Sequence, residues 1–192
     1  MPGVEIEKLT WREYMELPDA GPRYQLINGV LCMSPSPNRY HQVISRNLQY
    51  LIMRHLEDHP DGELFDAPFD VYISEFDVFQ PDLLFVREDR RGLLEKKGLV
   101  GAPDWVVEIL SPSTASLDKR DKRDNYARYG VRELWIIDPE LRRIHVYDLP
   151  QNPAKPVASY DEGETITPLT IPGLILSVDR IFKDRSPDSR AA

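Results

Sequence analysis

Two short apolar segments of this sequence each carry one carboxylate at a position where a buried charge is costly. Asp82 follows Pro81 at the start of the segment Asp82–Val86, and Glu108 lies among valine, isoleucine and leucine side chains in Trp105–Leu110. An ionised carboxylate is stable in a protein interior only when it is paired or bound to a cation. Two such residues on neighbouring strands therefore predict one shared partner, and a divalent metal ion fits that role best.

The type of metal ion is indicated by the oxygen ligands that the sequence can supply. Two carboxylates, one backbone carbonyl and water make an octahedral, oxygen-rich site, which suits Mg²⁺ or Mn²⁺. Cys32 is the only cysteine, so a cysteine-based zinc site and an intramolecular disulfide are both excluded. A simpler interpretation stays open for each carboxylate alone: Asp82 caps a turn, and Glu108 pairs with a nearby arginine or lysine.

A polar helix is expected over residues 116–129, directly after the capping residues of Ser111–Thr114. Lys119 and Lys122 share one face of this helix because residues three and four positions apart are neighbours on a helix surface. A lysine on that face can approach a metal-bound water or a scissile phosphate. Arg123 points elsewhere and is a candidate contact to a phosphodiester backbone, although mixed charges on a helix are most often a solvated surface.

The N-terminal part of the chain predicts two helices and a hairpin. Thr10-Trp11-Arg12-Glu13 fits a capping box and predicts a short helix. Asn28-Gly29 suits a two-residue turn between the strands Tyr24–Ile27 and Val30–Met33. Apolar residues recur at helical spacing from Val43 to Leu56, which predicts a longer helix.

The rest of the chain predicts strands that form a sheet. Alternation or short apolar runs indicate strands at residues 63–67, 69–73, 82–86, 105–110, 133–137 and 143–147, with a weaker one at 157–160. The order strand, helix, strand between residues 105 and 137 predicts a parallel pair joined by a crossover helix. The turn at Asp138-Pro139-Glu140 then leads into an antiparallel strand.

Length and composition limit the class of protein. With 192 residues, 41% apolar and 29% charged, the chain suits one globular domain, which we expect over residues 1–184 with a disordered tail at 185–192. The 24 Lys and Arg residues against 32 Asp and Glu give a net charge of -8, which is unfavourable for nucleic-acid binding, although a local basic patch still attracts a polyanion. Without a signal-peptide pattern or a long apolar run, a cytoplasmic protein that does not enter a membrane is expected.

Several of these segments, taken in order, resemble the Uma2 family of restriction-endonuclease-like proteins. The segments are Tyr-x-Leu-Ile-x-Gly at 24–29, Pro-Asp at 81–82, Val-Glu-Ile-Leu-Ser-Pro-Ser-Thr at 107–114, Asp-Lys-Arg-Asp-x-Tyr-Ala-Arg-Tyr-Gly-Val at 121–131 and Leu-Trp-Ile-Ile-Asp-Pro at 134–139. The resemblance implies a PD-(D/E)XK nuclease-like fold of mixed α/β class, with a restriction-endonuclease-like core, a mixed central sheet flanked by helices and an N-terminal hairpin. It also implies a metal-dependent phosphodiesterase site.

The same resemblance assigns roles to residues and shows two departures. Asp82 takes the place of the motif aspartate and Glu108 that of the motif glutamate. Leu110 stands where the motif usually has its lysine, so the resemblance suggests that Lys122 on the next helix has taken over this role. The family pattern has an acidic residue in the first hairpin where this chain has Gln25, which accepts a hydrogen bond but brings no charge.

The expected chemistry is hydrolysis of a phosphodiester by a metal-activated water. The ion is held by Asp82, Glu108 and the backbone carbonyl of Ile109, while Lys122 stabilises the developing charge. The expected substrate contacts are His41, Ser111, Ser113, Thr114, Lys119 and Arg123. Simpler roles stay open, because an exposed histidine at a helix end and hydroxyls that only cap a helix are common.

Three function classes remain on the sequence alone. The first is a metal-dependent endonuclease that acts on DNA. The second is a nucleic-acid-binding or regulatory module that has kept the fold and lost catalysis, as Gln25 and the acidic composition allow. The third is a protein-interaction module, with a homodimer formed through the hairpin or through the strand near His145.

Overall fold

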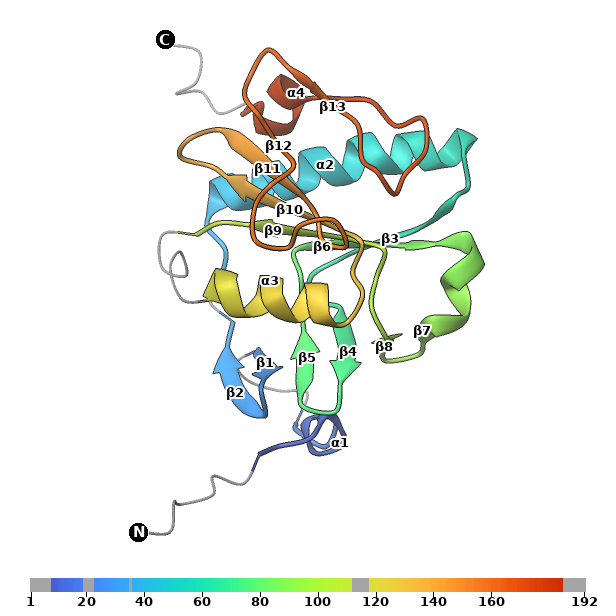
Figure 1. The fold of residues 1–192 in the computed structure, drawn as a ribbon, viewed down its shortest axis with the longest axis vertical. Helices are drawn as coiled ribbons and strands as arrows, with labels where there is room; N and C mark the ends of the chain where they lie inside the picture. The colour runs from blue at the N-terminus through green and yellow to red at the C-terminus, as the bar shows by residue number, and fades with distance from the viewer. Residues whose placement is uncertain (1–7, 19–22, 35, 112–117, 185–192) are drawn as a thin grey trace.

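The computed structural model describes residues 8–18, 23–34, 36–111 and 118–184, and for residues 118–121 it describes the backbone alone. The expected tail at 185–192 lies outside these residues. Figure 1 shows a layered α+β arrangement in which helices α2 (Arg39–Asp58) and α4 (Val178–Phe182) cover one side of a sheet and helix α3 (Asp118–Arg128) covers the other. In the part of the chain that is described, no helix is long and apolar enough to cross a bilayer.

The central sheet has six strands in the order β12-β11-β10-β9-β6-β3. These strands are β3 (Gly62–Asp66), β6 (Leu83–Arg87), β9 (Trp105–Ile109), β10 (Glu133–Asp138), β11 (Arg143–Asp148) and β12 (Ala158–Tyr160). Strands β9 and β10 are parallel and are joined through α3 (Asp118–Arg128), as the sequence predicts, while the other pairs are antiparallel. The sheet is therefore mixed.

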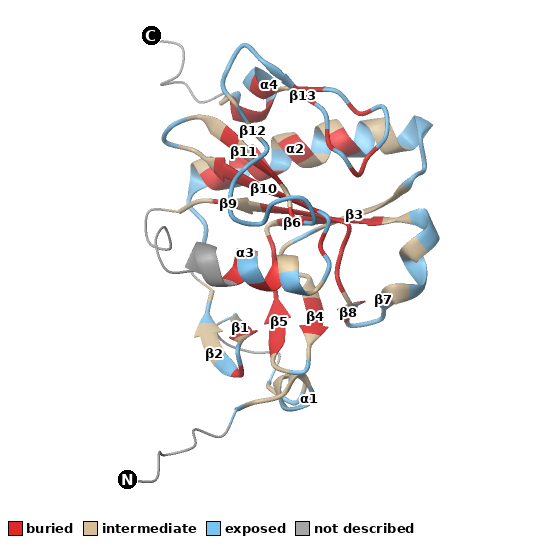
Figure 2. Ribbon diagram, viewed as in Figure 1, coloured by how far each residue is buried: buried red, intermediate tan, exposed pale blue. Residues whose placement is uncertain are grey.

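Alternation along these strands gives the sheet two apolar faces. One face, which includes Phe85, Val107 and Trp135, packs against α2 (Arg39–Asp58) and α4 (Val178–Phe182). The other face, which includes Val106 and Leu134, packs against α3 and part of a second sheet. Figure 2 shows the buried strands between these layers. Both faces are buried because side chains alternate between the two sides of a strand.

The second sheet contains the N-terminal hairpin and has the order β2-β1-β5-β4-β8-β7. Its strands are β1 (Tyr24–Ile27), β2 (Val30–Met33), β4 (Asp70–Ser74), β5 (Asp77–Phe79), β7 (Leu94–Glu95) and β8 (Gly98–Val100). The predicted turn is confirmed, since Asn28 and Gly29 have φ values of 53° and 81°. Two adjacent residues with positive φ are what a type I′ turn requires.

The two predicted N-terminal helices are confirmed. Thr10 caps α1 (Trp11–Tyr14) with both hydrogen bonds of a capping box. Asn38 caps α2 by accepting a hydrogen bond from the backbone N–H of His41. The cap fixes the first turn of α2, which is the turn that carries His41.

The structure corrects the expectation that the predicted strands form one sheet. The strand predicted at 69–73 pairs with β5 and β8 in the second sheet, and not with the strands predicted at 63–67 and 82–86. Strand β11, which carries His145, pairs with β10 and β12, so it is not a sheet edge. The sequence also missed several short elements: β5, β7, β8, β13 (Thr165–Ile166), β14 (Leu176–Ser177), the 3₁₀ helix η1 (Glu88–Leu93) and α4.

Candidate active site

The central sheet, the first turn of α2, the hairpin and α3 enclose one cavity of about 670 Å³. Asp82 and Glu108 both line it, together with His41 and Lys122. The pairing of β6 with β9 sets Leu83 beside Val107. The same register, extended by one residue, sets Asp82 beside Glu108, so the two predicted carboxylates are cross-strand neighbours on the α3 side of the sheet.

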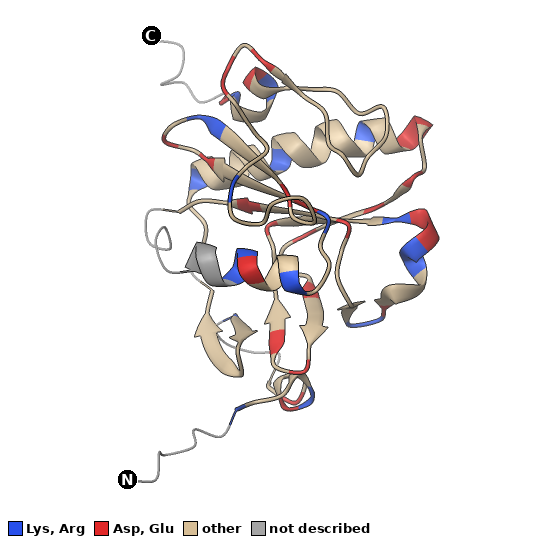
Figure 3. Ribbon diagram, in the orientation of Figure 1, with Lys and Arg blue, Asp and Glu red and all other residues tan. Residues whose placement is uncertain are grey.

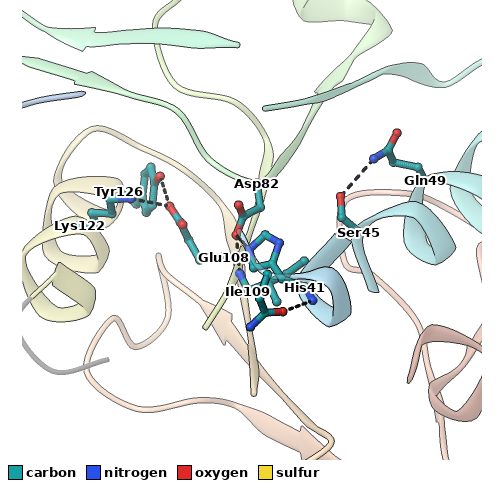
Figure 4. A network of polar contacts seen from close by, with 9 residues as sticks. His41, Ser45, Gln49, Asp82, Glu108, Ile109, Lys122 and Tyr126 are labelled. Atoms are coloured by element: carbon teal, nitrogen blue, oxygen red, sulfur yellow. Dashed lines mark hydrogen bonds and ion pairs between the residues drawn. The ribbon is translucent and has the colours of Figure 1, made fainter. Parts of the chain in front are cut away.

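Asp82 immediately precedes β6, and two donors hold one of its oxygens. Oδ2 accepts a hydrogen bond of 2.7 Å from the backbone N–H of Ile109 and lies 3.1 Å from Nε2 of His41 (Figure 4). Within the described residues Oδ1 makes no hydrogen bond, and the side chain is 21% exposed. One carboxylate oxygen is therefore fixed by the protein, and the other is left for a ligand in the cavity.

Glu108 is held in a similar way by helix α3. Its Oε1 accepts a hydrogen bond of 2.7 Å from the Tyr126 hydroxyl and lies 3.4 Å from Nζ of Lys122 (Figure 4). For Oε2 no hydrogen bond is formed with any residue described. Burial raises the pKa of Glu108, and the charge of Asp82 adds to this, against the opposing effects of Lys122 and Tyr126.

His41 is buried beneath Asp82, which corrects the expectation of an exposed histidine at a helix end. Burial disfavours its charged form, but the hydrogen bond and charge of Asp82, with a further contribution from Glu108, raise its pKa overall. Its side chain contacts Asp82, and no substrate contact is needed to explain its position. The helical spacing carried a signal for this, because His41 precedes Ile44 by three positions and Leu48 by seven and so lies on the apolar face of α2.

Helix α3 brings two of its residues to Glu108. Lys122 and Tyr126, four residues apart, lie on one face of the helix, as expected from helical spacing. Arg123 also lines the cavity, which corrects the expectation that it points elsewhere. Its guanidinium donates to Asp124 and to the carbonyl of Ala154, so it is tied to the protein.

The remaining predicted site residues differ in how far the structure describes them. Ser111 lines the cavity. Ser113 and Thr114 lie outside the described residues, as does the side chain of Lys119. The sequence missed other cavity residues, among them Arg23, Ser34, Ser36, Gln42 and Ser45. Gln42 and Ser45 follow His41 by one and four positions on α2, so the helical pattern would have pointed to Ser45 once His41 was known to face the site.

Gln25 lies in the cavity wall and is committed to structure. Its amide nitrogen donates to Oγ of Ser34 at 3.0 Å, and its amide oxygen accepts from the backbone N–H of Gln80 at 3.1 Å. The side chain therefore joins the hairpin to the segment that leads into Asp82. Both ends of the amide are used in this link, which fixes the Gln25 side chain in the cavity wall.

The donor set of the cavity fits a hard divalent cation. Among the described residues no three His, Cys, Asp or Glu side chains form a metal cluster, and Asp82 and Glu108 are the cavity carboxylates on adjacent chain segments, with Asp66 elsewhere in the lining. Asp82 Oδ1 and Glu108 Oε2 are oxygens from adjacent strands, and the Ile109 carbonyl belongs to the same strand as Glu108. Mg²⁺ and Mn²⁺ accept a few protein oxygens and keep several waters. Lys122 and Arg123 also line the cavity and add positive charge. Figure 3 shows Lys and Arg positions along α3 in blue.

The comparisons with known proteins show the family and the fold of this chain. The model of the Uma2 family, described as "Putative restriction endonuclease", matches residues 11–179. This chain belongs to the Uma2 family. Membership confirms the resemblance seen in the sequence segments around Asp82, Glu108 and α3.

Two further proteins are similar to this Uma2 chain. A crystal structure from Anabaena variabilis, described as "a putative nuclease belonging to DUF820", has a TM-score of 0.76 and 23% identity, and the match covers 91% of this chain and 97% of that one. It shows that the two chains share a fold, so the predicted mixed α/β class is confirmed. The uncharacterized protein sll1609 of Synechocystis sp. is 25% identical over 142 residues, which is 72% of this chain and 80% of that protein.

Proposed function

We propose that this Uma2 protein is a metal-dependent nuclease that hydrolyses phosphodiester bonds of DNA. One observation carries the proposal: Asp82 and Glu108, side by side on adjacent strands, each have one oxygen committed to the protein and one without a described partner, in the same cavity. In a purely structural ion pair, the hydrogen bonds of the protein satisfy both oxygens of the carboxylate. Here each carboxylate has one oxygen available to bind a ligand. The family described as "Putative restriction endonuclease" supports the same reaction class.

The chain's own residues divide the work as follows. Asp82, Glu108 and the Ile109 carbonyl would hold Mg²⁺ or Mn²⁺, which would activate water and balance charge on the phosphate. Lys122 places an ammonium beside Glu108, where it stabilises the additional negative charge of the reacting phosphate. His41 and Tyr126 keep the two carboxylates in place and do not themselves touch the substrate.

Cleavage of labelled DNA with Mn²⁺ or Mg²⁺ tests the proposal. The native chain is expected to cut, and Asp82→Asn and Glu108→Gln are each expected to lose at least about a hundredfold in rate, because each removes a charged metal ligand. Asp58→Asn, at the exposed end of α2, is the matched control and is expected to keep full activity. Cleavage that survives Asp82→Asn overturns this site.

A DNA-binding module without catalysis is the alternative result. The neutral Gln25 in the wall favours it, because the family pattern has an acidic residue at this position of the hairpin. In that case the chain binds DNA with a steep dependence on salt, and no metal ion produces cleavage.

A further inference from the structure

The proposed reactive groups lie below the protein surface. The side chain of Asp82 is 21% exposed, that of Glu108 is 20% exposed and that of Lys122 is 11% exposed. They sit on the floor of the cavity, with the hairpin and the start of α2 on one side and α3 on the other. A scissile phosphate reaches them only by entering the cavity.

The size of the cavity limits what can enter. Pockets of about 300 to 1,000 Å³ enclose molecules of drug size. At about 670 Å³ this cavity has the capacity for a nucleotide or two and not for a stretch of double helix. Enzymes that act inside such a pocket take a single strand or first move the nucleotide out of the duplex, which costs a few kcal/mol of unstacking and unpairing.

From this geometry, and on the basis of the nuclease function proposed above, we propose that the protein cleaves single-stranded DNA in preference to duplex. This class of substrate includes the unpaired arms and overhangs of partly paired DNA molecules. A single strand bends into the cavity without unpairing, so its phosphate meets Asp82 and Glu108 at lower cost than a phosphate of a paired strand.

Arg23 is the cation at the cavity wall that is available to guide such a strand. It is exposed at the start of β1, and no ion pair or hydrogen bond of its side chain occurs within the described residues. Arg123, by contrast, is held by Asp124 and by the Ala154 carbonyl. Arg23 therefore contacts a backbone phosphate that flanks the one being cut.

The walls contain little that would recognise bases. Tyr126 is the aromatic residue that lines the cavity within the described part of the chain, and its hydroxyl is already bonded to Glu108. Proteins that hold single strands by base stacking use several exposed aromatic rings. Binding here depends instead on phosphate contacts, and it is therefore expected to be steeply sensitive to salt and tolerant of base sequence.

A cleavage assay on one DNA sequence in three forms tests the strand preference. The same end-labelled strand is offered alone, in a blunt duplex and in a fork with one unpaired arm, each with Mn²⁺ and separately with Mg²⁺. The single strand is expected to be cut at least about tenfold faster than the blunt duplex, in line with an unpairing cost of more than about 1.4 kcal/mol. In the fork, cuts are expected on the unpaired arm.

The outcomes separate the two proposals. Equal or faster cleavage of the blunt duplex, with cuts inside the paired region, overturns the strand preference and leaves the nuclease function standing. Absence of cleavage on all three forms with either metal overturns the nuclease function and this inference with it.

The role of Arg23 is tested by Arg23→Gln against Arg54→Gln. Arg54 is exposed and does not line the cavity, and Arg54→Gln removes the same charge as Arg23→Gln. Arg23→Gln is expected to weaken single-strand binding and to reduce the slope of log affinity against log salt by about 0.7, with Mn²⁺ affinity unchanged. Arg54→Gln is expected to keep the native slope. Equal slopes for the two variants overturn the assigned contact.

Discussion

Nε2 of His41 lies 3.1 Å from Oδ2 of Asp82, the same oxygen that accepts the backbone N–H of Ile109 at 2.7 Å. Two donors from different elements, the first turn of α2 and strand β9, thus fix the orientation of one carboxylate. Groups that orient a metal ligand in this way commonly change metal affinity or activity by about 10- to 100-fold when they are removed. His41 is therefore a positioning residue for the proposed metal site.

We expect His41→Ala to lower the affinity for Mn²⁺ by about 10- to 100-fold, because Asp82 then rotates more freely. His41→Gln, which can supply an N–H donor, is expected to recover part of the loss. Titration calorimetry with Mn²⁺ measures both. His59→Ala, which changes an exposed histidine just beyond the other end of α2, is the control and should leave the affinity unchanged. Native affinity in His41→Ala contradicts the positioning role.

The sequence was sufficient to find the two carboxylates, since an acidic residue within an apolar strand is conspicuous. It was also sufficient for the hairpin, because Asn28-Gly29 matches one turn type. Strand pairing was harder to predict: the alternation at 69–73 identifies a strand, but its partner β5 was missed as a strand, and the pairing with β8 joins Asp70 to the distant Gly98. A local pattern does not carry information on contacts between residues far apart in sequence.

Tyr126 is expected to act on Glu108 through one hydrogen bond. Tyr126→Phe removes the 2.7 Å bond to Oε1 and keeps the ring that packs edge-on against Phe79. We expect either the free energy of unfolding or the free energy of Mn²⁺ binding to become less favourable by about 1.5 to 3 kcal/mol, since the hydrogen bond is to a charged group. Calorimetry with Mn²⁺ and urea unfolding separate the two effects.

Tyr129→Phe provides the matched control for this change. Its hydroxyl lies 3.4 Å from Oδ2 of Asp77 and not beside Glu108. Tyr129 directly follows α3, so this substitution also removes one tyrosine hydroxyl near that helix. Native Mn²⁺ affinity is expected. If both variants lose affinity to the same extent, the effect comes from helix stability and not from the orientation of Glu108.

Glu133 is a buried carboxylate with a structural role. It accepts hydrogen bonds from the indole N–H of Trp135, from the backbone N–H groups of Leu169 and Thr170 and from the Thr170 hydroxyl, all between 2.7 and 3.0 Å. Burial raises its pKa, and these donors oppose that effect. All four partners donate, so an amide in its place would turn N–H groups toward donors.

Glu133→Gln is therefore expected to lower the free energy of unfolding by about 1 to 3 kcal/mol, the cost of a buried polar group left without a partner. Urea denaturation measures the change. Glu57→Gln, which alters an exposed residue of α2, should have little effect. Equal stability of Glu133→Gln and the native chain would show that the loop around Thr170 does not depend on this carboxylate.

The phenols of Tyr14 and Tyr72 are expected to make the fold weaker at alkaline pH. Burial, followed by the nearby charge of Asp70, raises both pKa values well above the usual 10.0. Above about pH 10 the unfolded chain has released these protons while the folded chain retains them, so the free energy of unfolding falls as pH rises.

Urea unfolding at a series of pH values should show this fall, and it should be smaller in the double variant Tyr14→Phe, Tyr72→Phe. In Asp70→Asn, the absorbance of tyrosine phenolate should appear at a lower pH than in the native chain, because the charge that adds to burial in raising both pKa values is removed. A native-like fall in the double variant would assign the alkaline weakness to other groups.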